Sequence, residues 1–402
     1  MLLCNLRIPG KKGDYNLLVE KGRIAVVSPS SRLPFSSPGG IVLFLPGAIV
    51  FPGLINSHDH LDFNLFPLMG NKIYTNYTAW GWDIHVKNAA GIGAVLKIPQ
   101  ELRTQWGLYK NLLNGFTTVV NHGARLTKGV RLPSGNELIT VFQDCHNLHS
   151  VGFEKNWRWK LNRLSGDRPV VLHVGEGTDA AASREIDRLI RWNFFEKTLI
   201  GVHGVAMDER QAAHFKALVW CPDSNYFLLG RTAAADRLKD RLTLLFGTDS
   251  TLTSGWNHWD QIRMARREGV VTDEELLEMM TRSAAAVWGL GDRGKIAEGY
   301  VADLVIARPG TGGGDAAGAV GMDDFFSLNP PDLLLVLHEG QIRLFDETLL
   351  EGLVAGGFDP DAFYKISVQG RGKYVEGDLP GLMTEIRSYQ AEAAFPEGLT
   401  AG

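Results

Sequence analysis

The chain has 402 residues, of which 45% are hydrophobic and 21% charged, the composition of a globular protein with a large core. Its net charge of −4 argues against nucleic acid or an anionic membrane surface as a partner. Three widely spaced cysteines without a CxxC pair support neither a disulfide framework nor a thiolate metal site. The N-terminal residues do not resemble a secretory leader, and the longest apolar stretch is short and broken by prolines, so we expect a cytoplasmic protein without a membrane span.

Both ends of the chain are predicted to be rich in β-strands. Short strand-like runs separated by turns fill residues 1–50, and similar runs return at 294–307 and 333–345. Because these ends flank a different middle, we expect one small sheet domain built from residues 1–50 and 294–402. A glycine-rich stretch, 309–324, is predicted to be a mobile loop between the late strands.

The middle of the chain alternates strands with helices. The nearly continuous apolar runs typical of parallel strands covered on both faces are 116–120, 169–173, 198–203, 217–221 and 242–249. This alternation predicts a (β/α) barrel or a doubly wound sheet. The lack of a G-x-G-x-x-G turn after a strand disfavours the dinucleotide-binding form of the sheet.

Two helices in this region have clear boundaries. One opens with Asp208 and Gln211 as a capping box, and the other runs from Thr272 to a stop at Gly289. Between His122 and Pro169 we predict only a strand near 138–144 and a helix near 153–164. A regular eight-fold barrel needs more elements there.

Potential metal ligands stand at the ends of these strands. His58 and His60 are two residues apart, so on a strand their side chains point to the same side and can bind one cation. His173, His203 and Asp249 each end an apolar run, where barrel enzymes keep their chemistry. An isolated histidine pair is more often solvated or bonded within the fold, but five such residues at strand ends favour a metal centre. Nitrogen and carboxylate ligands suit zinc, with one position left for water.

Other residues are candidates for the same pocket. Glu176 follows His173 by three residues, and beside an activated water it could carry a proton to a leaving group; a surface carboxylate is the alternative. His122 ends another strand and either lines the pocket or bonds a neighbouring carbonyl. The candidate substrate contacts are His122 and, from the long segment 61–85, Asp62, Tyr74 and Trp82. The remaining histidines, predicted in loops or helices with structural or solvated roles, are His85, His146, His149, His214, His258 and His338.

Seven segments, in this order, resemble the amidohydrolase superfamily: FPGLINSHDH, GFTTVVNHG, HVGEG, GVHGVAMDE, VWCPDSNYFLLG, LFGTDS and AAAVWGLGDRGKIAEGYVADLVI. They span residues 51 to 307, and VWCPDSNYFLLG and GTDS are similar to the aminohydrolase and chlorohydrolase branch. The resemblance implies an α/β fold with a distorted (β/α)8 TIM barrel over 51–293 and a small β-sandwich built from both termini.

The resemblance also implies roles for the candidate residues. The metal ligands would be His58, His60, His173 and Asp249, and the catalytic residues would be Glu176, His203 and Asp249. Members with two metals use a carboxylated lysine on the fourth strand, whereas a glutamate three residues after the fifth-strand histidine marks the one-metal deaminases. Glu176 fits the second pattern and no lysine ends a convincing fourth strand, although the region 122–169 leaves the metal count open.

In the one-metal form, a divalent metal, expected to be zinc with iron as the alternative, lowers the pKa of water from about 15.7 to about 7. His203 would orient this water and Asp249 would take its proton. The metal-bound hydroxide would then attack a ring carbon, and Glu176 would protonate the departing nitrogen. We therefore expect hydrolysis of carbon–nitrogen bonds other than peptide bonds.

The expected substrate is a small cyclic amidine such as a purine, pyrimidine or triazine, which would be deaminated. Ring opening of an imidazolone-type cyclic amide and a catalytically inactive scaffold are the alternatives. Homodimers are common among similar proteins, so a homodimer is also an option here.

Overall fold

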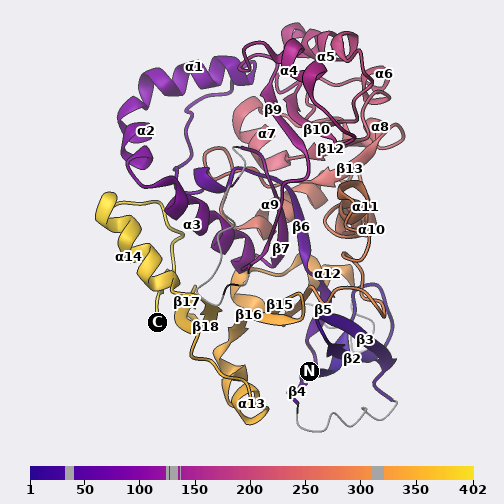
Figure 1. Ribbon diagram of the computed structural model, residues 1–402, viewed down its shortest axis with the longest axis vertical. Helices are drawn as coiled ribbons and strands as arrows, with labels where there is room; N and C mark the ends of the chain where they lie inside the picture. Colours follow the sequence, from indigo (N-terminus) through magenta and orange to yellow (C-terminus); the bar gives the residue numbers. More distant parts are fainter. Residues whose placement is uncertain (32–39, 124–125, 127–134, 136, 310–320) are drawn as a thin grey trace.

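The computed structural model describes residues 1–31, 40–123, 126, 135, 137–309 and 321–402 (Figure 1). Most of the predicted glycine-rich loop therefore lies outside the described residues. Among the helices that are described, none is long and apolar enough to cross a membrane.

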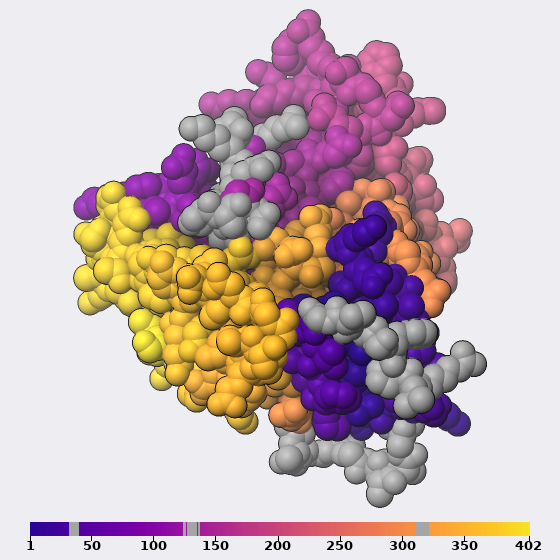
Figure 2. All heavy atoms as spheres, turned by 60° about the horizontal axis from the view of Figure 1, so that its bottom comes forward, coloured from indigo at the N-terminus to yellow at the C-terminus, as the bar shows by residue number. Residues whose placement is uncertain are grey.

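Both ends of the chain build one eleven-stranded sheet, in the order β19-β17-β18-β16-β15-β14-β5-β1-β2-β3 with β4 paired to β1. Its strands are β1 (Leu2–Arg7), β2 (Asp14–Glu20), β3 (Arg23–Pro29), β4 (Val42–Phe44), β5 (Ile49–Pro52), β14 (Leu304–Ala307), β15 (Leu333–His338), β16 (Gln341–Asp346), β17 (Phe363–Val368), β18 (Arg371–Glu376) and β19 (Leu399–Ala401). The two ends join where β5 runs antiparallel to β14, with Ile49 opposite Ala307. Figure 2 shows the N-terminal surface adjoining that of the C-terminal third.

The middle of the chain contains two parallel sheets, β6-β7-β8 and β13-β12-β11-β10-β9. Their strands are β6 (Leu54–Asp59), β7 (Phe116–Asn121), β8 (Thr140–Phe142), β9 (His146–Ser150), β10 (Val170–Val174), β11 (Leu199–His203), β12 (Ala217–Trp220) and β13 (Thr243–Phe246). Every residue of β7, β10, β11 and β12 is buried, as expected of parallel strands covered on both faces. The chain therefore has a mixed α/β fold with parallel sheets.

Helices lie between and around these strands (Figure 1). They are α1 (Tyr77–Lys87), α2 (Ala89–Leu96), α3 (Gln100–Leu113), α4 (Trp157–Arg163), α5 (Ala180–Trp192), α6 (Glu209–Ala212), α7 (Pro222–Leu229), α8 (Ala235–Leu238), α9 (His258–Arg267), α10 (Asp273–Met279), α11 (Arg282–Trp288), α12 (Met322–Phe326), α13 (Leu350–Ala355) and α14 (Leu379–Tyr389). A 3-10 turn, η1 (Leu61–Phe63), follows directly on β6. The predicted capping box of Asp208 and Gln211 is confirmed at the start of α6.

Three sequence predictions need correction. The single helix expected from Thr272 to Gly289 is interrupted between α10 and α11, where Thr281 has a non-helical backbone with φ −136° and ψ −100°. The carbonyl of Met280 at this break accepts a hydrogen bond from Ile55 N of β6 at 2.7 Å. The region 122–169 also holds a strand that we did not predict, β9, so His146 and His149 lie on a strand instead of in loops or helices. His338 likewise lies on a strand, β15.

The packing of α3 on η1 gives a test of the fold. A Cβ added to Gly107 of α3 would lie 2.2 Å from the carbonyl oxygen of Leu61, which is backbone and has no rotamer to change. We expect Gly107→Ala to lower the free energy of unfolding by about 1–3 kcal/mol, measured by urea denaturation. The matched control is Gly93→Ala in α2, where nothing lies within 4 Å of the new Cβ. That variant should gain about 0.5–1 kcal/mol, and equal stabilities for the two variants would contradict the close approach of α3 to η1.

Candidate active site

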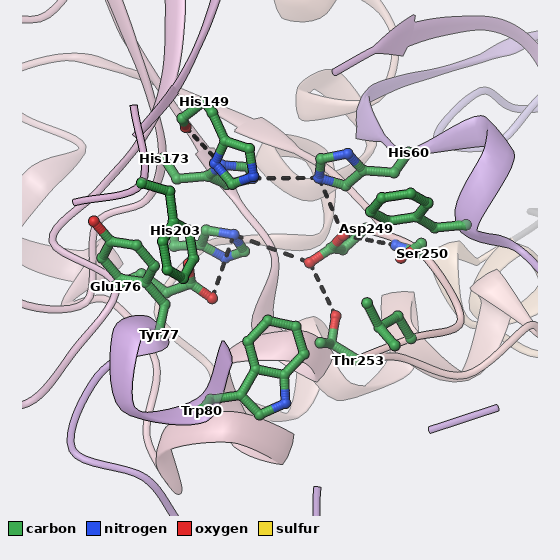
Figure 3. A pocket seen from close by; sticks show the side chains of 13 residues that line it. His60, Tyr77, Trp80, His149, His173, Glu176, His203, Asp249, Ser250 and Thr253 are labelled. Carbon is green, nitrogen blue, oxygen red and sulfur yellow. Dashed lines mark hydrogen bonds and ion pairs between the residues drawn. The ribbon is translucent and has the colours of Figure 1, made fainter. Parts of the chain in front are cut away.

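Five predicted residues meet at the carboxyl ends of the parallel strands. His58 lies on β6 and His60 directly after it, while His173 and His203 lie on β10 and β11 and Asp249 follows β13 by three residues. Four of them are almost completely buried, and His60 is slightly more exposed. Figure 3 shows His60, His173, His203 and Asp249 pointing toward one another from separate segments.

The imidazole nitrogens are arranged as ligands of one ion. His173 Nε2 lies 3.3 Å from His58 Nε2 and 3.4 Å from His60 Nε2. Nitrogens about 2.0–2.1 Å from a tetrahedral zinc ion are about 3.3–3.4 Å apart, which matches this spacing. His173 Nδ1 lies 2.8 Å from the carbonyl oxygen of His149, so Nδ1 holds the proton and Nε2 presents its lone pair.

A carboxylate completes the set. Asp249 Oδ1 lies 3.9 Å from Nε2 of both His58 and His60. Potential ligand atoms of His58, His203 and Asp249 lie within 4.8 Å of one another, as do those of His58, His60 and His173. Three nitrogens and one carboxylate are a donor set that fits zinc.

The electrostatics keep these groups in the protonation states that bind metal. Burial lowers the pKa of His58 well below its usual range, and the neighbouring His60 and His203 lower it further, so the ring is neutral. Burial alone would raise the pKa of Asp249, but His60, His203 and nearby hydrogen-bond donors outweigh it. The net pKa is lowered, and the carboxylate is ionised.

Glu176 lies in the same buried space, directly after β10. Its Oε1 is 3.7 Å from His203 Nε2. Burial raises the pKa of Glu176 well above its usual range, and the charge of Asp249 raises it further. His203 Nδ1 donates to Asn225 Oδ1 at 2.8 Å, which leaves Nε2 free to accept a hydrogen bond in the cavity.

His203 and Asp249 have unusual backbone conformations. Their φ angles are +71° and +55°, in the left-handed region that residues other than glycine rarely adopt. Such conformations persist only where the surrounding structure holds them, and they concentrate at functional sites. Both residues turn their side chains into the cavity from this conformation (Figure 3).

The cavity next to these groups has mostly aromatic walls. Its lining residues are His60, Phe63, Tyr77, Trp80, His149, Phe153, His173, Glu176, His203, Asp249, Ser250, Leu252 and Thr253. The Tyr77 hydroxyl donates to Glu185 Oε2 at 3.0 Å and accepts from Gly152 N at 2.8 Å, which joins α1, α5 and the segment after β9. Burial raises the pKa of Glu185 to about 7.

The predicted substrate contacts are divided between two environments. His122 and Asp62 line an adjoining cavity that shares His60 and His149 with the first, and both ring nitrogens of His122 are buried without a hydrogen-bond partner. Tyr74 and Trp82 are not among the lining residues of these two cavities. The Tyr74 hydroxyl donates to Asp83 at 2.8 Å inside the protein, and Trp82 is 72% exposed.

Several wall residues were missed from the sequence. They are Phe63, Tyr77, Trp80, His149, Phe153, Ser250, Leu252 and Thr253. Recognition of β9 would have placed His149 near a strand end, beside the candidate metal ligands. The aromatic residues carried no comparable signal, since most aromatic side chains serve packing.

A protein-family model described as "Amidohydrolase family" matches residues 167–353. The matched part of the chain is thus similar to the amidohydrolase family. The chain is also similar to the 5-methylthioadenosine/S-adenosylhomocysteine deaminase of Caldicellulosiruptor saccharolyticus, with 22% identity over 390 residues that cover 84% of this chain and 90% of that protein.

Two solved structures share the fold of this chain. One is an adenosine deaminase from Xanthomonas campestris with bound zinc, with a TM-score of 0.72, 18% identity and 98% of each chain covered. The other is an atrazine chlorohydrolase from Arthrobacter aurescens complexed with zinc, with a TM-score of 0.62 and 17% identity, covering 88% of this chain and 99% of that one.

Proposed function

We propose that this protein is an amidohydrolase, and that it is a metal-dependent hydrolytic deaminase that releases ammonia from a small nitrogen heterocycle. The observation that carries the proposal is the convergence of three imidazoles and one carboxylate beside the buried Glu176. Two of the three similar proteins are deaminases by name, and both solved structures contain zinc. These names support a reaction class.

In this proposal His58, His60, His173 and Asp249 would hold one zinc ion. A divalent metal bound there lowers the pKa of water to about 7 and so supplies a nucleophile at neutral pH. His203 is fixed by Asn225 and presents Nε2 to the cavity, where it orients the water and the substrate. Glu176 holds a proton at its carboxyl group and donates it to the departing nitrogen.

Two hydroxyl groups fix the orientation of Asp249. Ser224 Oγ donates to Asp249 Oδ2 at 2.9 Å, and Thr253 Oγ1 lies 3.0 Å from the same oxygen. These contacts leave Oδ1 on the side of His58 and His60. Oδ1 also accepts a hydrogen bond from Ser250 N at 2.7 Å, and its second lone pair can still take part in ligation.

The substrate class follows from the walls of the cavity. Phe63, Tyr77, Trp80 and Phe153 contribute four aromatic rings around the polar groups. Aromatic walls favour a flat, apolar ring through stacked or edge-on contacts. A purine, pyrimidine or triazine ring has this shape and carries the exocyclic nitrogen that the reaction removes.

We further propose that the eight parallel strands form one distorted (β/α)8 barrel over residues 51–293, with a β-sandwich domain from 1–50 and 294–402. Thr248 N and Asp249 N donate to the carbonyl of His58 at 3.2 and 3.0 Å, so the segment after β13 adjoins β6 and supports closure. The cytoplasmic location and the homodimer stay predictions from the sequence.

The test is a substrate panel applied to protein whose metal content has been measured. The zinc-loaded protein should release ammonia from at least one purine, pyrimidine or triazine, and iron in the purified protein would change only the identity of the metal. Imidazolone-type cyclic amides form a second arm, because ring opening yields product without ammonia. Ring opening alone would replace deamination, and a protein that binds no transition metal would overturn the proposal in favour of a scaffold.

A further inference from the structure

A fully buried lysine lies behind the candidate metal centre. Lys110, on α3, has no exposed surface. Its Nζ donates to Asn64 Oδ1 at 2.6 Å and to the carbonyl oxygen of Asp249 at 3.3 Å, and it lies 3.5 Å from Asp59 Oδ2. The three protons of the ammonium group thus face three oxygens. Burying a charge without such partners costs a large amount of free energy, so we expect these three oxygens to be needed for the buried ammonium group.

Two of these oxygens belong to the chain segments that carry the proposed ligands. Asp59 stands between His58 and His60, and its side chain faces away from theirs on the strand. Its Oδ1 accepts from Asn64 Nδ2 at 3.0 Å and its Oδ2 accepts from Asn111 Nδ2 at 2.8 Å. Together with Lys110, these contacts fix the end of β6 on the face opposite the paired histidines.

The other segment is the one that ends at Asp249. Its carbonyl oxygen accepts from Lys110 and from Thr248 Oγ1 at 3.1 Å, and its φ of +55° has to be held by its surroundings. Asn56 Nδ2 donates to Thr248 Oγ1 at 2.7 Å and to Asn111 Oδ1 at 2.9 Å. A continuous polar network therefore joins α3, the end of β6 and the segment after β13.

We propose that Lys110 is a positioning residue for the metal centre. It binds the carboxylate of Asp59 and the carbonyl of Asp249 together, and so fixes the distance between the paired histidines and the carboxylate ligand before a metal arrives. This inference rests on the proposed metal centre and is independent of the substrate. Outer groups that orient ligands typically change metal affinity or activity by about 10–100-fold when they are removed.

The chain offers a matched control in a second buried lysine. Lys373, on β18 of the terminal sheet, also has no exposed surface. Its Nζ donates to the carbonyl oxygens of Pro331 and Leu333 at 2.7 and 2.6 Å and to Asp346 Oδ2 at 2.7 Å. Lys110→Met and Lys373→Met therefore remove the same charge from equally buried three-oxygen sites, and only the first site adjoins the proposed ligands.

The experiment measures the zinc dissociation constant of the full-length wild type and both variants by chelator competition, and the unfolding of each metal-free protein. We expect zinc binding about 10–100-fold weaker in Lys110→Met and unchanged in Lys373→Met, even where both unfold more easily. Lys110→Gln, which keeps hydrogen-bond donors without the charge, should fall between wild type and Lys110→Met.

Each other outcome has a defined meaning. Equal zinc affinity in Lys110→Met and wild type would overturn the inference and leave the proposed function intact, whereas a wild type that binds no zinc would overturn the metal centre itself. Equal losses of zinc affinity in Lys110→Met and Lys373→Met would mean that the loss comes from a less stable fold, and this would also overturn the inference. If neither Lys110 variant folds, the lysine serves the fold and the inference is also wrong.

Discussion

Replacement of Glu176 by glutamine is expected to reduce turnover by about 10²–10⁴-fold, the usual contribution of a positioned acid or base. Glutamine keeps the size and polarity of the side chain but cannot transfer a proton. Zinc content should not change, because Glu176 is not among the groups of potential ligands whose atoms converge. The measurement is steady-state ammonia release on the best substrate of the panel, together with zinc analysis of the same sample.

Glu185→Gln is the matched control for this experiment. Glu185 is a second buried glutamate beside the cavity, but its carboxylate binds the Tyr77 hydroxyl behind the wall. Burial raises its pKa to about 7, and the side-chain oxygen of glutamine can still accept the hydrogen bond from the Tyr77 hydroxyl. Turnover should change little in this variant. If the Glu176→Gln enzyme were as active as the Glu185→Gln enzyme, the assignment of Glu176 as the proton donor would be wrong.

His173→Ala is expected to weaken zinc binding by more than the roughly 100-fold that an outer group contributes. His173 Nε2 is the nitrogen that lies close to both His58 and His60, so its removal opens one side of the site. Turnover should be lost with the metal. Zinc retained after dialysis against a chelator measures the first effect, and ammonia release measures the second.

Thermal unfolding gives an independent measure of zinc binding by wild type and His173→Ala. A metal present at 100 times its dissociation constant stabilises the folded wild type by about 2.7 kcal/mol, so added zinc should raise the melting temperature. His173→Ala should show no such rise. His146→Ala serves as the control. His146 is the first residue of β9, at the strand end away from the candidate metal centre, and its Nε2 lies 3.0 Å from the carbonyl oxygen of Ser165. Full zinc retention by His173→Ala would contradict the ligand assignment.

Much of the site could be predicted because it depends on a simple rule. The runs 169–173 and 198–203 are continuous and apolar, so they predict buried parallel strands, and β10 and β11 occupy nearly the same residues. The carboxyl ends of such strands lie at one edge, which brings His173 and His203 together without knowledge of the loops. β9 escaped prediction because HNLHS contains only one strongly apolar residue and reads as a loop.

The residues of α1 that line the cavity could not be predicted, because they depend on the rotational phase of the helix. Asn76 caps α1 with a side-chain bond to Ala79 N, and this cap sets which residues face inward. At about 100° per residue, Trp80 lies about 60° from Tyr77 around the helix, whereas Trp82 lies about 140° away. Tyr77 and Trp80 therefore line the cavity and Trp82 faces solvent. The start of α1 was not visible in the amino-acid pattern.

The join between β5 and β14 has a consequence for biosynthesis. β5 ends one residue before β6, the strand that carries His58. All four residues of β5 pair with β14, whose residues the ribosome adds much later, from Leu304 onward. A nascent chain exposes this unpaired edge throughout synthesis of the middle segment, and exposed edges invite aggregation. Such distant pairing also slows folding. Truncation before Leu304 should therefore yield insoluble protein, even though every proposed zinc ligand would still be present.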